Sequence, residues 1–381
     1  MPVDVFLSAG EASGDLQASL LVGALRRLRG GLTFAAVGGD KLAGAGADVW
    51  LDSVAQEWAS MGHLRAYAKI PWLLTVMLGL ARRLLRNPPR LLVCVDFGAF
   101  NLRMLEWLRF CGYRGKAVYY FPPGAWLDDP RQARKVARVA TALTPLAHQA
   151  AFYKSLGLPV EFYGHPLAGS IATRAQRPPG EPPLVAVLPG SRRDEVSVHL
   201  PVLAAAAARL VRSRPARFVV IAASEGRRNE LRAGWPRDCG GAEAVVRQET
   251  VRAMADADVA WVASGTAVLE AALLGVPQAA FYRLPEPAYK LALKKVPRIV
   301  RGPITLPNLV TGRRIIPELL QYEFEPERLA ALTVDLLGDG AARAVQLEGY
   351  AELRRALGPE DALERIASSI LRQATADGVA P

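Results

Sequence analysis

The chain has 381 residues, of which 51% are hydrophobic and 33 are glycine. That length exceeds one ordinary core and suits two domains, and the composition is typical of an α/β protein with many tight turns. The net charge of +11 favours acidic partners such as phosphates and anionic lipids. Nucleic acid is not expected, since the arginines are spread through helical patterns without a nucleic-acid-binding signature.

The three cysteines, Cys94, Cys111 and Cys239, show no paired spacing, so neither a disulfide framework nor a metal site is indicated. The start, MPVDVFLSAG, has no basic region followed by a long apolar stretch, so we expect no signal peptide and a cytoplasmic protein. The sequence leaves the oligomeric state open, and a second copy of the chain, in a homodimer, is one of the partners that we consider.

Short β-rich runs alternate with helical spacing through the first half of the chain. The predicted strands are residues 3–7, 34–37, 91–95 and 116–120. This alternation is typical of a parallel sheet covered by helices, so we expect a Rossmann-like domain over residues 1–170.

A glycine-rich turn follows the first predicted strand and precedes an amphipathic helical pattern. It carries Glu11, Ser13 and Asp15. A plain helix cap needs only one such side chain. Three polar groups at the carboxyl end of a strand therefore predict a binding site.

The segment at about 61–90 contains a 12-residue apolar run, 70–81, bounded by Arg65 and Lys69 on one side and by Arg82, Arg83 and Arg86 on the other. The run is too short to span a bilayer, which takes about 20 residues. Two interpretations stay open. One is a helix at the membrane surface, with Trp72, Leu73 and Met77 in the acyl boundary; the other is a buried core helix.

Residues 171–183 are rich in proline and predict a linker. The strand pattern then restarts at 184–188, 218–222, 259–262 and 278–282, which predicts a second Rossmann-like domain over 184–340. Two doubly wound domains are expected to direct the carboxyl ends of their strands to a shared cleft. The last residues, 341–381, are helical in pattern and are expected to pack back on the first domain.

Two strand-to-helix turns in the second half suit a phosphorylated ligand. They are Pro189-Gly190-Ser191 and Ser264-Gly265-Thr266. Such turns direct N–H groups outward at a helix start, where hydrogen bonds and the helix dipole both favour an anion. The alternative is that each turn only caps its helix.

Charged residues beside both turns extend this interpretation. Arg192, followed by Arg193, is placed to donate a planar fork of N–H groups to phosphate oxygens. Glu270 lies one helical turn beyond Thr266 and suits the two hydroxyls of a ribose. Together the turns predict a site for a nucleoside diphosphate.

The motifs resemble those of one known family, lipid-A-disaccharide synthase. They are GEASGD at 10–15, VGGDKLAGAG at 37–46, SMGHL at 60–64, EFYGHPLA at 161–168, LPGSRRDEV at 188–196, ASGTAVLEAALLGVP at 263–277 and LPNLVTGRRIIPELLQ at 306–321. They occur in the family's order and cover most of the chain.

The resemblance implies an inverting GT-B glycosyltransferase that transfers 2,3-diacylglucosamine from UDP to lipid X, works without a metal or cofactor, and sits peripherally on the inner face of the cytoplasmic membrane. Asp96 matches the family's candidate general base. The implied acceptor residues are Glu11, Ser13 and Asp15. The implied nucleotide-sugar residues are Ser191, Arg192, Ser264, Gly265, Thr266, Glu270 and Asn308.

The chain departs from the family at three places, all in the first half. Ala99 replaces an aspartate, Asp128 and Asp129 replace a tryptophan and an arginine, and LTPLAHQAAFY at 143–153 has an altered turn. Acidic residues in place of an arginine would repel an acceptor phosphate. The alternatives are therefore a glycosyltransferase with another lipid acceptor, a 2-epimerase of UDP-N-acetylglucosamine, against which GEASGD argues, and a non-catalytic sugar-nucleotide or membrane-surface binding protein.

Overall fold

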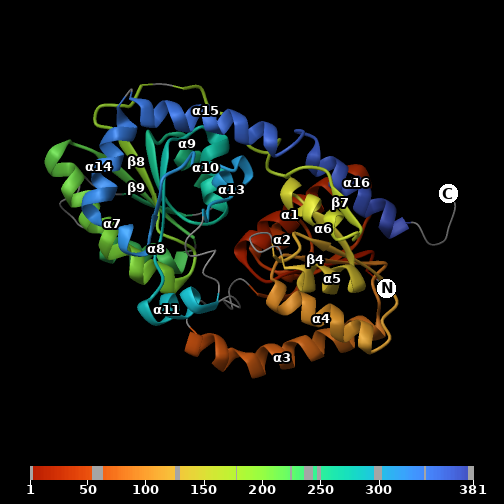
Figure 1. Cartoon of the computed structure of the whole chain (residues 1–381). Helices are drawn as coiled ribbons and strands as arrows, with labels where there is room; N and C mark the ends of the chain where they lie inside the picture. Colours follow the sequence, from red (N-terminus) through yellow and green to blue (C-terminus); the bar gives the residue numbers. More distant parts are fainter. Residues whose placement is uncertain are drawn as a thin grey trace. The chain divides into compact units, whose positions relative to one another are not determined.

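The computed structural model describes residues 3–53, 63–124, 129–176, 178–223, 225–235, 243–246, 250–295, 303–338 and 340–375. The chain forms two compact units, Met1–Ser170 with Leu357–Pro381 and Ile171–Ala356 (Figure 1). Each unit is a parallel sheet flanked by helices.

The first sheet has the strand order β3-β2-β1-β4-β5-β6-β7, with parallel neighbours throughout. Its strands are β1 (Val5–Ala9), β2 (Phe34–Gly38), β3 (Asp48–Asp52), β4 (Leu91–Val95), β5 (Lys116–Tyr120), β6 (Thr141–Thr144) and β7 (Val160–Phe162). Its helices are α1 (Ala12–Leu28), α2 (Asp40–Gly44), α3 (His63–Arg86), α4 (Gly98–Phe110), α5 (Pro130–Val139), α6 (Ala147–Ser155) and α16 (Ala362–Thr375).

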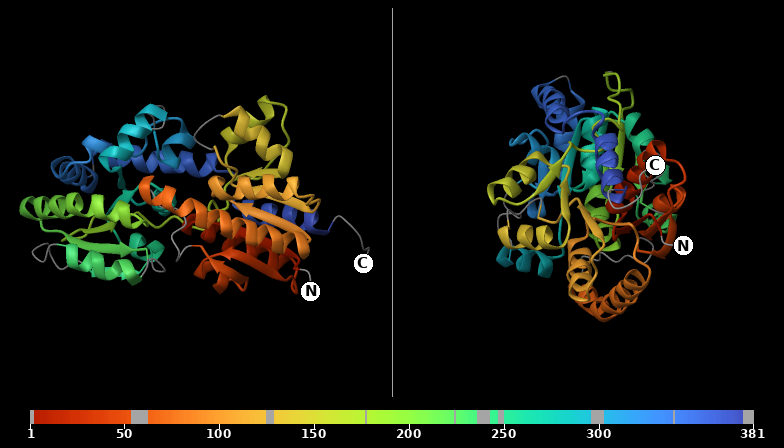
Figure 2. Two further views of the ribbon diagram at one scale, coloured as in Figure 1. Left: turned by 90° about the horizontal axis from the view of Figure 1, so that it is seen from below. Right: turned by 90° about the vertical axis from the view of Figure 1, so that its right-hand side faces the viewer.

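Alternate residues of the central strands feed two separate cores. Phe6 and Cys94 pack with residues of α3, α4 and α5, whereas Val5 and Leu7 pack with residues of α1 and α16. Because successive side chains of a strand point to opposite faces, both faces of this sheet are buried under helices (Figure 2). That explains why its central strands read as continuous apolar runs.

The second sheet has the order β10-β9-β8-β11-β12-β13, again with parallel neighbours. Its strands are β8 (Leu184–Leu188), β9 (Arg217–Ala222), β10 (Glu243–Val246), β11 (Val259–Ala263), β12 (Gln278–Tyr282) and β13 (Glu318–Leu320). Its helices are α7 (Arg193–Ser213), α8 (Glu225–Gly234), α9 (Thr250–Ala255), α10 (Thr266–Leu274), α11 (Glu286–Lys295), α13 (Leu306–Thr311), η2 (Gln321–Glu323), α14 (Pro326–Leu337) and α15 (Ala341–Ala356).

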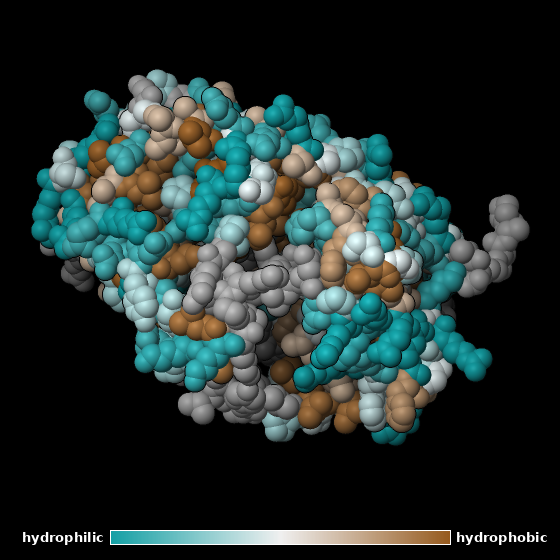
Figure 3. Space-filling model, viewed as in Figure 1, coloured by the Kyte–Doolittle hydropathy of each residue, from teal (hydrophilic) through white to brown (hydrophobic). Residues whose placement is uncertain are grey.

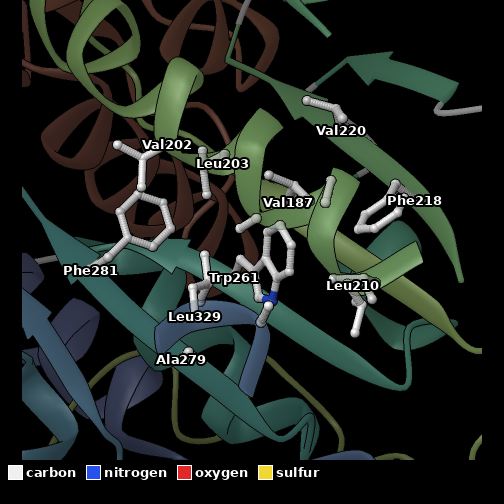
Figure 4. Packing of buried hydrophobic residues seen from close by; sticks show 14 of the residues in the cluster. Val187, Val202, Leu203, Leu210, Phe218, Val220, Trp261, Ala279, Phe281 and Leu329 are labelled. Atoms are coloured by element: carbon white, nitrogen blue, oxygen red, sulfur yellow. The ribbon is translucent and has the colours of Figure 1, made fainter. Parts of the chain in front are cut away.

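Trp261 is the largest fully buried side chain of this unit. It lies among Val187, Leu203 and Leu329 (Figure 4), and its indole N–H donates to the Thr333 hydroxyl at 2.8 Å. α7 supplies much of this core. Among the described helices it is the one long and apolar enough to cross a membrane by length and composition, a test that the core helix of a globular domain also passes.

One expectation about the domain limits needs correction. α15 packs on the second sheet, because Gln346 Oε1 accepts from the N–H of Gln278 at 2.8 Å and the Tyr350 hydroxyl donates to the Val276 carbonyl at 3.1 Å. Of the two last helices, it is α16 that packs in the first unit, against α1. The predicted linker 171–183 begins where the first unit ends, and it contacts the second unit, since the Arg174 N–H donates to the Leu274 carbonyl at 3.0 Å.

Both sheets confirm the predicted α/β fold of two Rossmann-like, doubly wound domains. In each, the strand order reverses once, between β1 and β4 in the first sheet and between β8 and β11 in the second. Ligands of such sheets bind outside the carboxyl ends of the strands at this reversal. The candidate residues of the sequence follow those four strands, except Asn308, which lies in α13 between β12 and β13.

Candidate functional site

Asp96 directly follows β4 and adopts a left-handed backbone conformation, with a φ angle of 50°, and Phe97 repeats it with 48°. The Asp96 N–H donates to the Tyr120 carbonyl at 3.0 Å. Its carbonyl accepts from Asn101 Nδ2 and from the Tyr119 hydroxyl, each at 3.0 Å. A left-handed residue with a Cβ costs about 1–2 kcal/mol, so the surrounding contacts hold Asp96 in this half-buried position.

Two glycines make room for this turn. A Cβ on Gly10 would lie 2.0 Å from the Phe97 ring, and one on Gly98 would lie 2.6 Å from Pro123 Cβ. The loop after β1 and the loop after β5 therefore approach the Asp96 turn from both sides. Any larger residue at either glycine would displace Phe97 or Pro123.

Glu11 and Ser13 lie beside the Asp96 turn. Glu11 is the N-cap of α1 in an extended conformation, and both side chains are half-buried. A Cβ on Gly14 would lie 3.4 Å from the Val95 carbonyl, which places the first turn of α1 against the end of β4. Glu11, Ser13 and Asp96 thus share the reversal point of the first sheet.

Asp15 has another task. It is 2% exposed, and its carboxylate accepts from the N–H groups of Gly39 at 2.7 Å, Lys41 at 3.1 Å and Leu42 at 3.2 Å. Burial raises the pKa of this carboxyl group, although the three hydrogen bonds oppose the rise. Asp15 anchors the start of α2, and its contact with the acceptor stays a prediction.

Two of the departures from the family border the loop after β5. The Gln149 side chain, which lies in α6 within the altered segment 143–153, donates to the Pro122 carbonyl of that loop at 3.0 Å. Ala99 is exposed in the first turn of α4, next to Gly98 and its neighbour Pro123. Ala99 and the segment 143–153 therefore lie on either side of the same loop.

Asp129 is explained by local structure. It is the N-cap of α5, and its Oδ1 accepts from the N–H groups of Arg131 at 2.9 Å and Gln132 at 3.4 Å. An aspartate is a preferred residue for this position. The inferred repulsion of an acceptor phosphate is therefore not needed to account for Asp129, while Asp128 lies outside the described residues.

In the second unit, the N–H groups of the turn after β8 already bind a carboxylate of the protein itself, that of Glu195. Glu195 Oε2 accepts from the N–H groups of Ser191 and Arg192, each at 3.3 Å. Glu195 Oε1 accepts from the Arg192 guanidinium at 2.7 Å and from the Tyr282 hydroxyl at 3.2 Å. These two N–H groups are those that the sequence had offered to a phosphate, so Ser191 retains only its exposed hydroxyl for that role.

The turn before α10 is different. Gly265 is the N-cap, no side chain caps this described turn, and its first helical turn carries no acidic residue. Ser264 and Thr266 are half-buried, and Gly265 is exposed. The first N–H groups of a helix lack intrahelical acceptors, so this end favours an anion. Glu270, one turn further on, is 6% exposed.

Asn308 is a structural residue in this fold. It is fully buried; its Oδ1 accepts from the N–H groups of Ile315 and Ile316, each at 2.9 Å. Its Nδ2 donates to the Ile316 carbonyl at 2.8 Å and to Glu318 at 2.9 Å. Both acceptor sites and both donors of the amide are used within the protein, and the contact of Asn308 with the nucleotide stays a prediction.

His199 has no role predicted from the sequence, and it joins the loops that follow β8 and β12. Its Nδ1 lies 2.8 Å from the Pro189 carbonyl, and its Nε2 accepts from the Arg283 N–H at 3.1 Å. Burial lowers the pKa of His199, which fits a neutral ring with a proton on Nδ1. No spacing in the sequence pairs these residues, because the bonds span 10 and 84 positions.

His165 is a second buried, neutral histidine. Its Nδ1 accepts from the Leu167 N–H at 3.2 Å, and burial lowers its pKa to about 3. Since the unfolded chain binds the proton more readily, stability falls as the pH drops from about 6.5 towards 3. At pH 5 the loss from this residue is about 2 kcal/mol.

His165→Asn is expected to reduce this acid sensitivity, because the amide oxygen can accept the Leu167 N–H without titrating. Urea unfolding at pH 7.5 and pH 5 measures it. His148→Asn, at an exposed position, is the matched control and should retain the wild-type difference between the two pH values. An equal difference in His165→Asn and wild type would contradict the expectation.

No group of three or more His, Cys, Asp or Glu side chains that could hold a metal ion occurs in the described part of the chain. Cys94 is buried and Cys111 exposed, and Cys239 lies outside that part.

Comparison with known proteins gives a consistent result. The sequence profile of the family described as lipid-A-disaccharide synthetase matches residues 5–366. The lipid-A-disaccharide synthase of Myxococcus xanthus is 35% identical over 97% of this chain and 97% of its own. That of Azotobacter vinelandii is 35% identical over 97% of this chain and 98% of its own.

Solved structures share the fold at low identity. A UDP-GlcNAc 2-epimerase from Neisseria meningitidis, bound to UDP-GlcNAc, has a TM-score of 0.63 at 11% identity, covering 97% of this chain and 100% of its own. MurG of Acinetobacter baumannii has a TM-score of 0.53 at 14% identity, covering 97% and 99%. These likenesses support the GT-B architecture alone.

Proposed function

Because the chain belongs to the lipid-A-disaccharide synthase family and is a glycosyltransferase, we propose that it transfers 2,3-diacylglucosamine from its UDP conjugate to the 6-hydroxyl of lipid X, 2,3-diacylglucosamine 1-phosphate. The products are UDP and the β-1,6 lipid A disaccharide. The observation that carries the proposal is the carboxylate of Asp96, held at the reversal point of the first sheet beside Glu11 and Ser13.

Inversion requires the acceptor oxygen to attack the anomeric carbon from the side opposite UDP. Asp96 takes the hydroxyl proton as the new C–O bond forms and the bond to the UDP oxygen breaks. Glu11 and Ser13 bind the acceptor sugar. The negative charge that develops on UDP is stabilised by the start of α10 and by Arg192, and Glu270 binds the ribose.

A second candidate keeps the donor and changes the acceptor. It is favoured by two of the family departures, Ala99 and the segment 143–153, which both border the loop after β5, where Gln149 contacts Pro122. The same acylated sugar would then be transferred from UDP to the hydroxyl group of another lipid. Release of UDP from UDP-2,3-diacylglucosamine, measured with and without lipid X in detergent micelles, separates the two.

Release that depends on lipid X and yields a tetra-acyl disaccharide supports the first proposal. Binding of the UDP-sugar without any stimulation by lipid X supports the second. Failure to bind UDP at all excludes both, because both use the same donor site.

We further propose that α3 contacts the inner surface of the cytoplasmic membrane, where both acylated substrates reside. Trp72, Leu74 and Leu78 are 40%, 43% and 45% exposed, and apolar surface appears along the lower edge of Figure 3, where α3 runs. Arg82 and Arg86 are exposed beyond them and suit lipid phosphates. The side chains of 63–70, with Arg65 and Lys69, lie outside the described residues, as do Met61 and Gly62.

Met77 is corrected by the structure. It is 8% exposed and packs in the core with Leu80, Ala81 and Leu84, so it is unavailable to acyl chains. Leu73 is half-buried against the same core. α3 therefore has one face in the core and one apolar face exposed. The interpretation as a core helix describes the first face, and the interpretation as a helix at the membrane surface concerns the second.

The double variant Leu74→Glu with Leu78→Glu is expected to weaken binding to anionic phospholipid vesicles by about tenfold or more, since each leucine transferred from water contributes about 1.5–3 kcal/mol. Cosedimentation measures it. The control carries Val334→Glu and Val345→Glu, which change equally exposed positions of α14 and α15. An equal loss in the control would show that added charge alone is responsible.

A further inference from the structure

Asp96 has a left-handed backbone conformation, which an aspartate tolerates but does not adopt by preference. We propose that Asn101 and Tyr119 form a clamp on the Asp96 carbonyl oxygen, and that this clamp sets the direction of the Asp96 carboxylate for proton removal. Both are positioning residues that act through Asp96. The inference rests on the proposed function in taking Asp96 as the base.

The clamp lies where backbone strain is concentrated. Among the described residues, four that are not glycine have a positive φ angle: Asp96, Phe97, Phe121 and Gln321. Three of these follow β4 or β5 directly, at the carboxyl edge of the first sheet. Such residues persist only where the surrounding structure holds them, and they cluster at functional sites.

Asn101 is fixed on both sides of its amide. Its Nδ2 donates to the Asp96 carbonyl at 3.0 Å and to the Ser8 carbonyl at 2.9 Å, with the Val95 carbonyl at 3.3 Å. Its Oδ1 accepts from the Ser8 hydroxyl at 2.7 Å. The side chain is fully buried, so it ties the ends of β1 and β4 to the Asp96 peptide.

Tyr119 supplies the second half of the clamp from β5. Its hydroxyl donates to the Asp96 carbonyl at 3.0 Å, and its side chain is fully buried. Burial raises the pKa of Tyr119 well above its usual value, so the hydroxyl keeps its proton and stays a donor. Strands β1, β4 and β5 are thereby all connected to one carbonyl oxygen.

The clamp restricts the direction of the Asp96 side chain. The Asp96 N–H is bound to the Tyr120 carbonyl at 3.0 Å, so the two backbone polar groups of this residue are both held. With its backbone fixed, the Cα–Cβ bond points in one direction. A general base must reach its proton within hydrogen-bonding distance, and a misplacement of about 1 Å can lower the rate about 100-fold.

Tyr119→Phe removes one donor of the clamp without changing the shape of the core. We expect kcat to fall about 3- to 10-fold, as for the loss of one neutral hydrogen bond, with the KM of both substrates unchanged. Tyr153→Phe is the matched control: Tyr153 is as deeply buried, and its hydroxyl has no hydrogen-bond partner in the described structure. Its kcat should equal that of the wild type.

Combination with Asp96→Asn tests whether Tyr119 acts through Asp96. If it does, Tyr119→Phe lowers the residual rate of Asp96→Asn no further. A rate that falls by the same factor in both backgrounds overturns the inference, as does equal behaviour of Tyr119→Phe and Tyr153→Phe. An Asp96→Asn variant with full activity instead overturns the assignment of the base.

A crystal structure of Asn101→Ala gives a readout that does not need activity. We expect Asp96 to lose its positive φ angle when this donor is absent. An unchanged φ angle would show that the clamp does not hold Asp96. This readout decides the inference even if lipid X proves not to be the acceptor.

Discussion

Replacing Asp96 with asparagine is expected to lower kcat by about 100- to 10,000-fold, the usual contribution of a general base. An amide oxygen cannot take the proton of the attacking hydroxyl at neutral pH. Asparagine is nearly the same size and tolerates the left-handed conformation as aspartate does. The clamp from Asn101 and Tyr119 binds the backbone carbonyl, so it persists in the variant.

The measurement combines single-turnover release of UDP with calorimetric binding of UDP. Binding should match the wild type, because the proposed donor site lies in the other sheet, at Arg192 and the start of α10. Asp48→Asn, at an exposed position in β3, controls for the loss of one negative charge. Transfer at the wild-type rate in Asp96→Asn would falsify the role of Asp96 and leave another group as the base.

Several central parts of the fold are predictable because their signals are local. Strands β4 and β8 are continuous apolar runs, β5 and β12 are apolar after their first residue, and all four have the predicted limits. The edge strands β7 and β13 have only three residues each, too few to show a period. They form because a neighbouring strand offers its backbone groups, which a single-sequence pattern does not contain.

The site was predicted less completely, for a related reason. Asp15 and Asn308 occupy motif positions that suit ligand binding, yet their polar atoms bind backbone groups of the protein itself. For Asp15 those groups are 24–27 residues away. Residue type and spacing do not reveal which N–H groups a carboxylate will meet. Glu195 shows the same effect, since it occupies donors that the sequence assigned to a phosphate.

The ion pair between Arg192 and Glu195 leads to a second large expected effect, on the affinity of the donor site for UDP. The Arg192 guanidinium contacts Glu195 at 2.7 Å, and the side chains are 27% and 9% exposed. Removing Arg192 takes a charged donor from the UDP diphosphate and leaves the nearly buried Glu195 carboxylate without its cation. We expect the Kd for UDP to rise about 10- to 100-fold in Arg192→Ala, since hydrogen bonds to charged groups contribute about 1.5–3 kcal/mol.

Adding Glu195→Gln to Arg192→Ala is expected to recover part of the lost affinity. The glutamine removes the buried negative charge, while its oxygen still accepts from the N–H groups that Glu195 now binds. Isothermal titration with UDP measures all variants, and Arg212→Ala, exposed in the last turn of α7, controls for the change in net charge. If the double variant binds UDP no better than Arg192→Ala, repulsion from Glu195 makes no contribution. The loss then belongs to the missing guanidinium alone.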